Sequence, residues 1–243
     1  MSTTYDLIIL GSGSTAFAAA LRATNSGARV LMFEKSVLGG TCINWGCIPS
    51  KTLIHAALFK HESTLGNRLG LNLANDNPAI DGERLFRYRD TVVTELRKER
   101  YLDVLANMKG LELVKGTARF SDAHTVECDD QRYTSERFLV AVGGNPRIPP
   151  LPGLEKCTYF TSRSALLLKE IPSSLVIIGG GVIAVELGQM YHRLGSRVTI
   201  LEHGSRLLPA IEPELSQSVR GILEHEGIKI VTQVTFCSLD RLG

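Results

Sequence analysis

The sequence predicts an α/β protein built from two related units, each made of a strand, a tight glycine turn, a helix and a second strand. One internal repeat is the main evidence, because residues 6–35 resemble residues 174–203 at a constant offset of 168 positions. A second observation is that residues 7–10 and 175–178 are short apolar runs, as expected for parallel strands buried on both faces. The recurring positions are Gly11, Gly13, Ala16, Gly27, Val30 and Glu34 in the first copy, and Gly179, Gly181, Ala184, Gly195, Val198 and Glu202 in the second.

Each element of the repeat follows from its local pattern. After the first strand, the residues favour a helix over 16–22, a break at Gly27 and a strand over 29–33. The second copy repeats this with strands at 175–178 and 197–201 and a helix over 184–194.

The segment between the two copies predicts further structure. Residues 83–107 are charged and have helical spacing of apolar residues, whereas residues 111–137 alternate and predict a small antiparallel insertion. A buried strand is expected to follow at 138–142. The prolines between 146 and 152 predict a crossover, so we expect one domain at 1–147 and an incomplete second domain at 148–243.

Composition excludes several functional classes. The net charge is +2 and the basic residues do not cluster with aromatic ones, so we expect neither a nucleic-acid nor a membrane-surface partner. The first residues lack the features of a secretory signal, and no apolar run approaches the roughly 20 residues of a membrane span. We therefore expect a cytoplasmic protein, in which five cysteines do not form a disulfide framework.

Both glycine turns fit the G-x-G-x-x-G/A pattern of Rossmann-like dinucleotide-binding domains. Such a turn lets the backbone approach a pyrophosphate at a helix N-terminus, and an acidic residue about 20 positions later binds a ribose. Glu34 and Glu202 fit the acidic position. A single copy could be an ordinary strand–helix turn, but two copies in register predict two dinucleotides, most simply FAD and a nicotinamide nucleotide.

The coenzyme choice stays open between NADH and NADPH. Glu202 favours NADH because a carboxylate repels a 2′-phosphate. His203 and Arg206 follow closely and could instead hold that phosphate.

Two cysteines lie in the stretch GGTCINWGCIPSK, residues 39–51. Cys42 and Cys47 flank an expected helix start, where the helix dipole and Lys51 would lower a thiol pKa and favour redox chemistry. Zinc binding with His55 and His61 is an alternative, although the spacing is short and the two histidines lie on opposite sides of a helix. Two buried, unreactive cysteines are the other alternative.

Taken together, these motifs resemble the flavoprotein disulfide reductases, the class I pyridine nucleotide-disulfide oxidoreductases, over nearly the whole chain. The pattern G-G-T-C-x4-C-x-P-S-K is specific to that family. Residues 16–20, 95–105 and 111–120 are most similar to its mercuric reductase branch.

The resemblance implies a role for each site residue. NAD(P)H would reduce FAD, and FAD would reduce a Cys42–Cys47 disulfide, with Cys47 as the flavin-side thiolate and Cys42 as the interchange sulfur. Lys51 would lie near the flavin and pair with Glu186. The implied FAD contacts are Gly11, Gly13, Ala16, Glu34, Ser36, Gly40, Thr41, Lys51, Ala118 and Gly143, and the implied nicotinamide-nucleotide contacts are Gly179, Gly181, Ala184 and Glu202.

In the mercuric reductase branch, the substrate would be Hg(II), bound transiently by Cys42 and Cys47 and reduced to Hg(0). The alternatives are a dihydrolipoamide dehydrogenase-like disulfide reductase and a non-catalytic dinucleotide-binding fragment. The resemblance also implies a homodimer whose C-terminal dimerisation domain lies beyond residue 243, so we expect these residues alone to be weakly active or inactive.

Overall fold

The computed structural model describes residues 3–70 and 78–239, which form two compact units. The first unit contains residues 1–49 and 90–145, and the second contains residues 50–89 and 146–243. Two long helices pass from one unit to the other, α3 at Cys47–Leu65 and α4 at Gly82–Arg97. The end of the predicted second domain, residues 240–243, lies outside the described residues.

The first unit is built on a parallel sheet with strand order β4-β3-β2-β8. Its strands are β2 (Leu7–Leu10), β3 (Val30–Glu34), β4 (Leu111–Lys115) and β8 (Phe138–Val140). The helical segments that belong wholly to this unit are α1 (Ser14–Asn25), α2 (Gly40–Trp45), a π-helical segment (Lys98–Leu102) and α5 (Asp103–Asn107).

Alternate residues of this sheet face two different cores. Ile9 and Met32 face α1 and pack with its Ala16, Phe17 and Ala20. The neighbouring positions face a smaller sheet on the opposite side, through Ile8, Leu10, Leu31, Phe33, Val126 and Tyr133. The central strands are therefore buried on both faces, as their apolar sequences predict.

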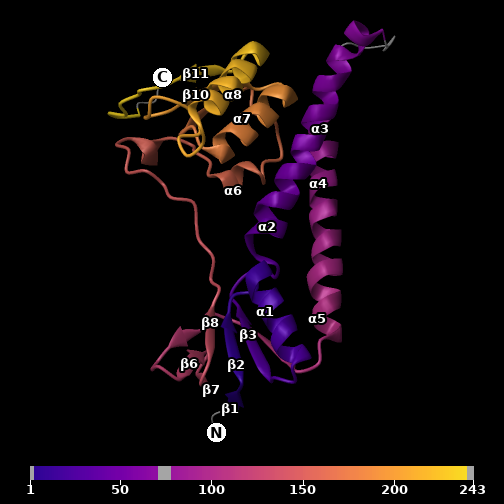
Figure 1. The fold of residues 1–243 in the computed structure, drawn as a ribbon, viewed down its shortest axis with the longest axis vertical. Helices are drawn as coiled ribbons and strands as arrows, with labels where there is room; N and C mark the ends of the chain where they lie inside the picture. Colours follow the sequence, from indigo (N-terminus) through magenta and orange to yellow (C-terminus); the bar gives the residue numbers. More distant parts are fainter. Residues whose placement is uncertain (1–2, 71–77, 240–243) are drawn as a thin grey trace. The chain divides into compact units, whose positions relative to one another are not determined.

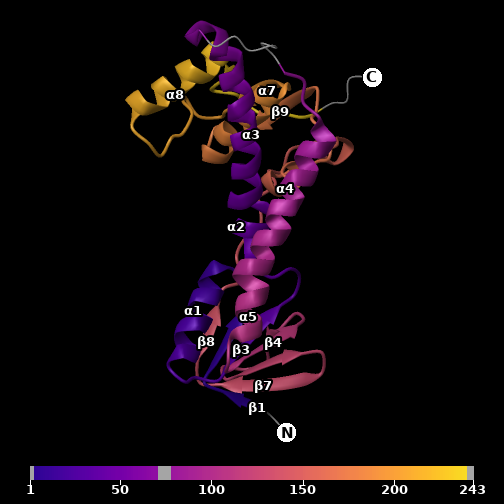
Figure 2. The same cartoon turned by 90° about the vertical axis from the view of Figure 1, so that its right-hand side faces the viewer.

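The smaller sheet has the order β1-β7-β6-β5, and Figures 1 and 2 show its strand β7 beside β1. Its strands are β1 (Thr3–Tyr5), β5 (Arg119–Phe120), β6 (Thr125–Cys128) and β7 (Gln131–Ser135). β5 and β7 pair antiparallel with β6, whereas β1 pairs parallel with β7.

Two expectations for this region need correction. Residues 111–115 do not belong to the antiparallel insertion, because they pair in parallel with β3, and the antiparallel part begins at Arg119. The segment 138–142 is not a fully buried strand, since β8 ends at Val140 and both Val140 and Val142 are exposed. β8 lies at one end of the described strand order, where the sheet gives it only one neighbour.

The second unit contains a parallel sheet with the order β11-β10-β9. Its elements are β9 (Ser174–Ile178), α7 (Val182–Leu194), β10 (Arg197–Leu201), α8 (Pro213–Glu226), β11 (Lys229–Val231), the short helix α6 (Ser162–Ala165) and 3₁₀ turns at Gly66–Leu69 and Leu154–Lys156. One face of the sheet packs on α7 and α8 through Leu187, Met190, Val198, Ile200, Leu223 and Ile230.

Residues 50–89 belong to this second unit, although the sequence led us to expect one continuous domain over 1–147. Leu53 and Ala57 of α3 and Phe86 of α4 pack into the core of the second unit. Arg89 is 2% exposed and donates hydrogen bonds to the carbonyl oxygens of Leu166, at 2.7 Å, and Leu168, at 3.0 Å.

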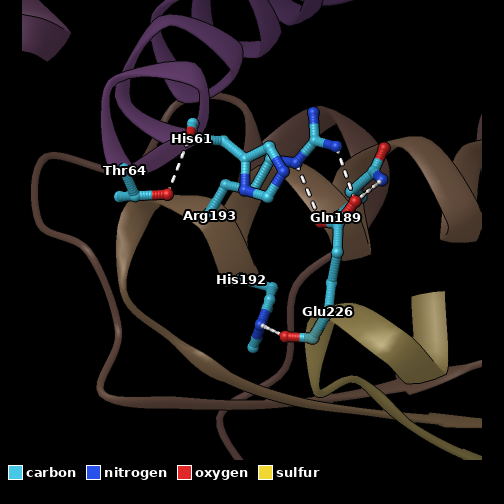
Figure 3. Close-up of polar contacts among 6 residues, drawn as sticks. All are labelled: His61, Thr64, Gln189, His192, Arg193 and Glu226. Atoms are coloured by element: carbon cyan, nitrogen blue, oxygen red, sulfur yellow. Dashed lines mark hydrogen bonds and ion pairs between the residues drawn. The ribbon is translucent and has the colours of Figure 1, made fainter. Parts of the chain in front are cut away.

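A polar cluster joins α7 to the end of α8 in this unit (Figure 3). Arg193 donates two hydrogen bonds to the Glu226 carboxylate, at 2.6 and 2.8 Å, and Gln189 donates a third at 2.8 Å. Burial raises the pKa of Glu226, but Arg193, Gln189 and the charge of His61 outweigh that effect and lower the pKa overall. The cluster therefore favours an ionised Glu226.

In the described part of the chain, no helix has both the length and the apolar character that crossing a membrane requires.

Candidate redox and dinucleotide sites

The first glycine turn connects β2 to α1 in very little space. Gly11 has φ +109°, and a Cβ atom there would lie 2.2 Å from the carbonyl oxygen of Ala141. A Cβ on Gly40 would lie 2.7 Å from Cα of Gly13. The turn therefore brings three stretches of backbone together, and a side chain at Gly11 or Gly40 would push them apart.

Glu34, at the end of β3, is held beside this turn. Its Oε2 accepts a hydrogen bond from Ser12 Oγ at 2.5 Å, and its Oε1 accepts one from the backbone N–H of Ser36 at 2.7 Å. The carboxylate that the sequence assigns to ribose binding thus lies next to the turn that it assigns to the pyrophosphate.

Glu202, at the end of β10, is held in the corresponding way in the second unit. Its two oxygens accept hydrogen bonds from the backbone N–H groups of Gly180 and Gly204, each at 2.5 Å. Gly180 and Gly204 occupy the repeat positions of Ser12 and Ser36. The internal repeat therefore extends to the hydrogen bonds of its acidic residues, with a backbone N–H in place of the Ser12 hydroxyl.

The starts of α1 and α7 fit phosphate groups. Both first turns consist of uncharged residues, and among the described residues no side chain caps either helix. A Cβ atom at Gly179 or Gly181 would meet no described atom within 4 Å, which leaves open space beside α7. Unpaired N–H groups and the positive end of a helix favour negative charge, so these turns fit the pyrophosphates of two dinucleotides.

Cys42 and Cys47 lie on different helices that meet at a glycine. Cys42 is in α2, Cys47 is the first residue of α3, and Pro49 falls in the first turn of α3, where proline is tolerated. Between them, a Cβ atom on Gly46 would lie 2.9 Å from the carbonyl oxygen of Thr41. Glycine at position 46 therefore lets α3 begin close to α2.

The two thiols are in hydrogen-bond contact, and this affects Cys42. Burial is the main cause that raises the pKa of Cys42, and the hydrogen bond with Cys47 raises it further, whereas the Arg100 charge acts in the opposite direction. We expected the helix start to lower a thiol pKa, and for Cys42 that expectation was wrong. Burial and the Cys47 contact are the larger effects on this thiol, and they raise its pKa.

The alternative of a zinc site is not supported. Among the residues that the structure describes, which include Cys42, Cys47, His55 and His61, no group of three or more His, Cys, Asp and Glu side chains could hold a metal ion.

Lys51 and Glu186 form the expected ion pair in the second unit. Lys51 Nζ lies 2.6 Å from Glu186 Oε1, and the side chains are 58% and 40% exposed. Lys51 is on α3 and Glu186 is on α7, so the pair joins two helices.

The remaining predicted contact residues have varied surroundings. Ala16 on α1 is fully buried, and Ala184 on α7 is half-buried. Ala118 packs against the core between the two sheets of the first unit. Thr41 and Gly143 are exposed, and Gly143 has φ +70°. Their contacts with FAD or a nicotinamide nucleotide stay predictions.

Several residues at these sites were not predicted. Ser12 holds Glu34, and Gly180 and Gly204 hold Glu202. Ser12 is equivalent to Gly180 in the repeat, and Gly204 is equivalent to the predicted residue Ser36, so the repeat could have revealed all three. Asn44 lies between the cysteines and is buried, while its partner Arg97 is 53 positions away. No local pattern indicates a contact over that distance.

Known proteins are similar to this chain in sequence. A match to the pyridine nucleotide-disulphide oxidoreductase family covers residues 5–243. The chain is 40% identical to a mercuric reductase of Staphylococcus aureus and 42% identical to one of Lysinibacillus sphaericus, in each case over 98% of this chain and 43% of the relative. It is also 38% identical to a dihydrolipoyl dehydrogenase of Thermus scotoductus, over 94% of this chain and 49% of that protein.

A solved structure agrees with this relationship. The Cu(II) complex of the HOCl-induced flavoprotein disulfide reductase RclA from Escherichia coli matches with a TM-score of 0.85 and 30% identity, over 100% of this chain and 52% of that one. The chain thus spans about half the length, or somewhat less, of the proteins it matches. The chain belongs to the pyridine nucleotide-disulphide oxidoreductase family, whose members use FAD and NAD(P)H.

Proposed function

We propose that this chain supplies the dinucleotide-binding and dithiol part of a flavoprotein that reduces Hg(II) to Hg(0). The observation that carries the proposal is the hydrogen-bond contact between the Cys42 and Cys47 thiols, at the boundary between two helices. The mercuric reductases that share 40–42% identity with the chain favour Hg(II) as the substrate.

The overall reaction is NAD(P)H + Hg(II) → NAD(P)⁺ + H⁺ + Hg(0). Bound FAD would supply a carrier that accepts two electrons from the nicotinamide and delivers them at the dithiol. The first glycine turn with Glu34 would hold FAD, and the second turn with Glu202 would hold the nicotinamide nucleotide.

The two sulfur atoms would bind the metal ion. Soft thiolates prefer a soft metal, and each thiol loses its proton when it binds Hg(II). Because burial and the Cys47 contact keep the proton on Cys42, that proton must leave as the metal arrives. When two electrons convert Hg(II) to Hg(0), the metal leaves and the two sulfurs regain protons.

Lys51 and Glu186 would hold a fixed pair of charges beside the path of the hydride, as the family resemblance implies. The positive Lys51 would favour negative charge that develops nearby, and Glu186 would keep its ammonium group in one place.

A second candidate is reduction of a disulfide or its reverse, as in the dihydrolipoyl dehydrogenase that is 38% identical. Glu202 favours this candidate, because a carboxylate at the end of the second strand of such a domain would bind a ribose hydroxyl and repel a 2′-phosphate. The third candidate is a fragment that binds dinucleotides without catalysis. We also propose that the flavoprotein to which this chain belongs forms a homodimer.

One experiment separates the three candidates. The purified 243-residue chain is loaded with FAD, and NADH or NADPH oxidation is followed anaerobically with Hg(II), with lipoamide or with no acceptor, while Hg(0) vapour is collected. Because these residues alone are expected to be weakly active, the proposal predicts slow release of Hg(0) in proportion to the coenzyme oxidised, and no Hg(0) from a Cys42→Ser, Cys47→Ser variant. Turnover of lipoamide without Hg(0) would support the second candidate, and FAD binding without any oxidation would support the third.

A further inference from the structure

Asn44, which lies between Cys42 and Cys47 in the sequence, is buried. Its amide group forms hydrogen bonds with the backbone at the start of α2. Its side chain is 5% exposed, and Nδ2 donates hydrogen bonds to the carbonyl oxygens of Leu38, at 2.9 Å, and Gly40, at 2.8 Å. Both amide protons are therefore used on the segment that leads into Cys42.

Arg97 determines which way the Asn44 amide points. Arg97 Nη1 donates a hydrogen bond to Asn44 Oδ1 at 3.1 Å. A flipped amide would place its oxygen against two carbonyl oxygens and its NH₂ group against a guanidinium, so the network allows one orientation. Arg97 is the last residue of α4, next to the π-helical segment, and lies in the same unit as Asn44.

The segment that carries Cys42 needs such an anchor. α2 has six residues, and an isolated helix of that length is not stable in water. Gly39 precedes it with φ +98°, Gly40 is its first residue with φ +65°, and Gly46 follows its last residue. Glycines give this segment conformational freedom at both ends, which would let the distance between Cys42 and Cys47 vary.

We propose that Asn44, oriented by Arg97, is a positioning residue that holds Cys42 at bonding distance from Cys47 and thereby stabilises their disulfide. This inference rests on the proposed function, in which the Cys42–Cys47 disulfide must first be reduced to the dithiol that binds Hg(II).

The test is a redox equilibrium rather than turnover. The chain is equilibrated anaerobically with mixtures of reduced and oxidised glutathione, in which the two thiols lose two electrons and two protons while one oxidised glutathione becomes two reduced molecules. The disulfide fraction is measured by alkylating the remaining thiols and mapping Cys42 and Cys47 by mass spectrometry. Trp45, the single tryptophan of the chain, lies between the cysteines and gives a second readout through its fluorescence.

The variants are Asn44→Asp, which removes both donors at nearly constant shape, and Arg97→Met, which removes the orienting donor. We expect each to lower the equilibrium constant for disulfide formation about tenfold, equivalent to about 30 mV for a two-electron couple. Arg97→Lys keeps a donor and a charge, so it should recover part of the loss.

Two matched controls make the same changes nearby. Asn107→Asp alters an exposed asparagine whose amide donates a hydrogen bond to the Asp103 carbonyl oxygen. Lys98→Met removes the cation of Lys98, which is next to Arg97 in the sequence and pairs with the Asp103 carboxylate. Both should leave the constant within twofold of the wild type.

The possible failures are distinguishable. If the wild-type chain forms no Cys42–Cys47 disulfide at any ratio, the proposed function and this inference both fail. If it forms one and the Arg97→Met chain, folded by circular dichroism, keeps the wild-type constant within twofold, the inference is wrong and the proposed function stands. The Arg97→Met chain distinguishes these outcomes even if Asn44→Asp does not fold.

Discussion

Lys51 Nζ lies 2.6 Å from Glu186 Oε1, and the two residues are 135 positions apart in the sequence. Both side chains are more than one-third exposed, so solvent screens the pair and it contributes little to folding. Because this pair contributes little to folding and lies at positions that the family resemblance assigns to the hydride path, we propose that it acts in catalysis.

The first prediction separates those two roles. Lys51→Met and Glu186→Gln should each change the stability by less than about 1 kcal/mol, because the pair is exposed. Each should slow the reduction of bound flavin by NAD(P)H about tenfold or more, measured by stopped-flow absorbance. Arg220→Met breaks the exposed Arg220–Glu224 pair on α8 and is the matched control, with no expected change in that rate. Equal rates in all variants would rule out a catalytic role for Lys51 and Glu186.

Gly181→Ala should separate folding from nucleotide binding. Gly181 has φ −76°, and a Cβ atom there would enter open space, so the melting temperature should stay within a few degrees of the wild type. The added methyl group would occupy the space assigned to the pyrophosphate, so NAD(P)H affinity should fall at least about tenfold by calorimetry. Gly11→Ala is the contrasting variant, because its Cβ atom would collide with the Ala141 backbone and destabilise the fold. Unchanged NAD(P)H affinity in the Gly181→Ala chain would contradict the second dinucleotide site.

Cys42 should react with alkylating agents only at elevated pH. Burial and the Cys47 contact raise its pKa above the ordinary value of 9.0, so its thiolate should appear at higher pH than that of a cysteine in a short peptide. Iodoacetamide labelling of the reduced chain, mapped by mass spectrometry, gives the pH profile. Because the Arg100 charge lowers this pKa, Arg100→Met should move the profile further upward. A Cys42 profile at or below that of the peptide would contradict the burial argument.

The raised pKa of Cys42 also makes the stability of the fold depend on pH under alkaline conditions. The folded state holds the Cys42 proton more tightly than the unfolded state. The stability that this thiol contributes is therefore complete below the ordinary value of 9.0 and is lost as the pH rises through the higher folded pKa. Cys42→Ser should show a smaller loss of melting temperature over that range.

Glu226 should give the opposite pH dependence. Its folded pKa is lowered from 4.5, so its stabilising effect is present above that value and is lost as the pH falls through the folded pKa. Arg193→Met leaves a carboxylate that is 9% exposed without its main partner, which should cost about 3 kcal/mol at neutral pH by urea unfolding. The Arg193→Met, Glu226→Gln double variant should recover part of that loss, and full additivity of the two changes would argue against the pair.

Glu202 should control coenzyme choice. Glu202→Gln keeps an oxygen acceptor for one backbone N–H but removes the negative charge, so the ratio of NADPH to NADH affinity should rise about tenfold. Fluorescence titration with each coenzyme measures that ratio. An unchanged ratio would place the discrimination elsewhere, with His203 and Arg206 as the next residues to vary.

The repeat made the strands around both glycine turns predictable, since β2 and β10 have the expected bounds. The helices were predicted less well, because α1 extends beyond the expected range at both ends and α7 begins two residues earlier than expected. β4 was assigned to the wrong kind of sheet because half-exposed parallel strands and antiparallel strands show the same alternation. Residues 50–89 belong to the second unit because Leu53, Ala57 and Phe86 pack with residues of that unit that are distant in the sequence. Likewise, the Asn44–Arg97 contact and the burial of Cys42 are tertiary properties that local patterns do not encode.

The central claim is that electrons from a nicotinamide nucleotide reach the Cys42–Cys47 pair. The most direct measurement adds one equivalent of NADH or NADPH anaerobically to the oxidised, FAD-loaded chain and counts new thiols at each cysteine by alkylation and mass spectrometry. The account predicts two new thiols per chain, at Cys42 and Cys47, and no change at Cys128, Cys157 and Cys237. A coenzyme that is oxidised while Cys42 and Cys47 gain no thiols would contradict it.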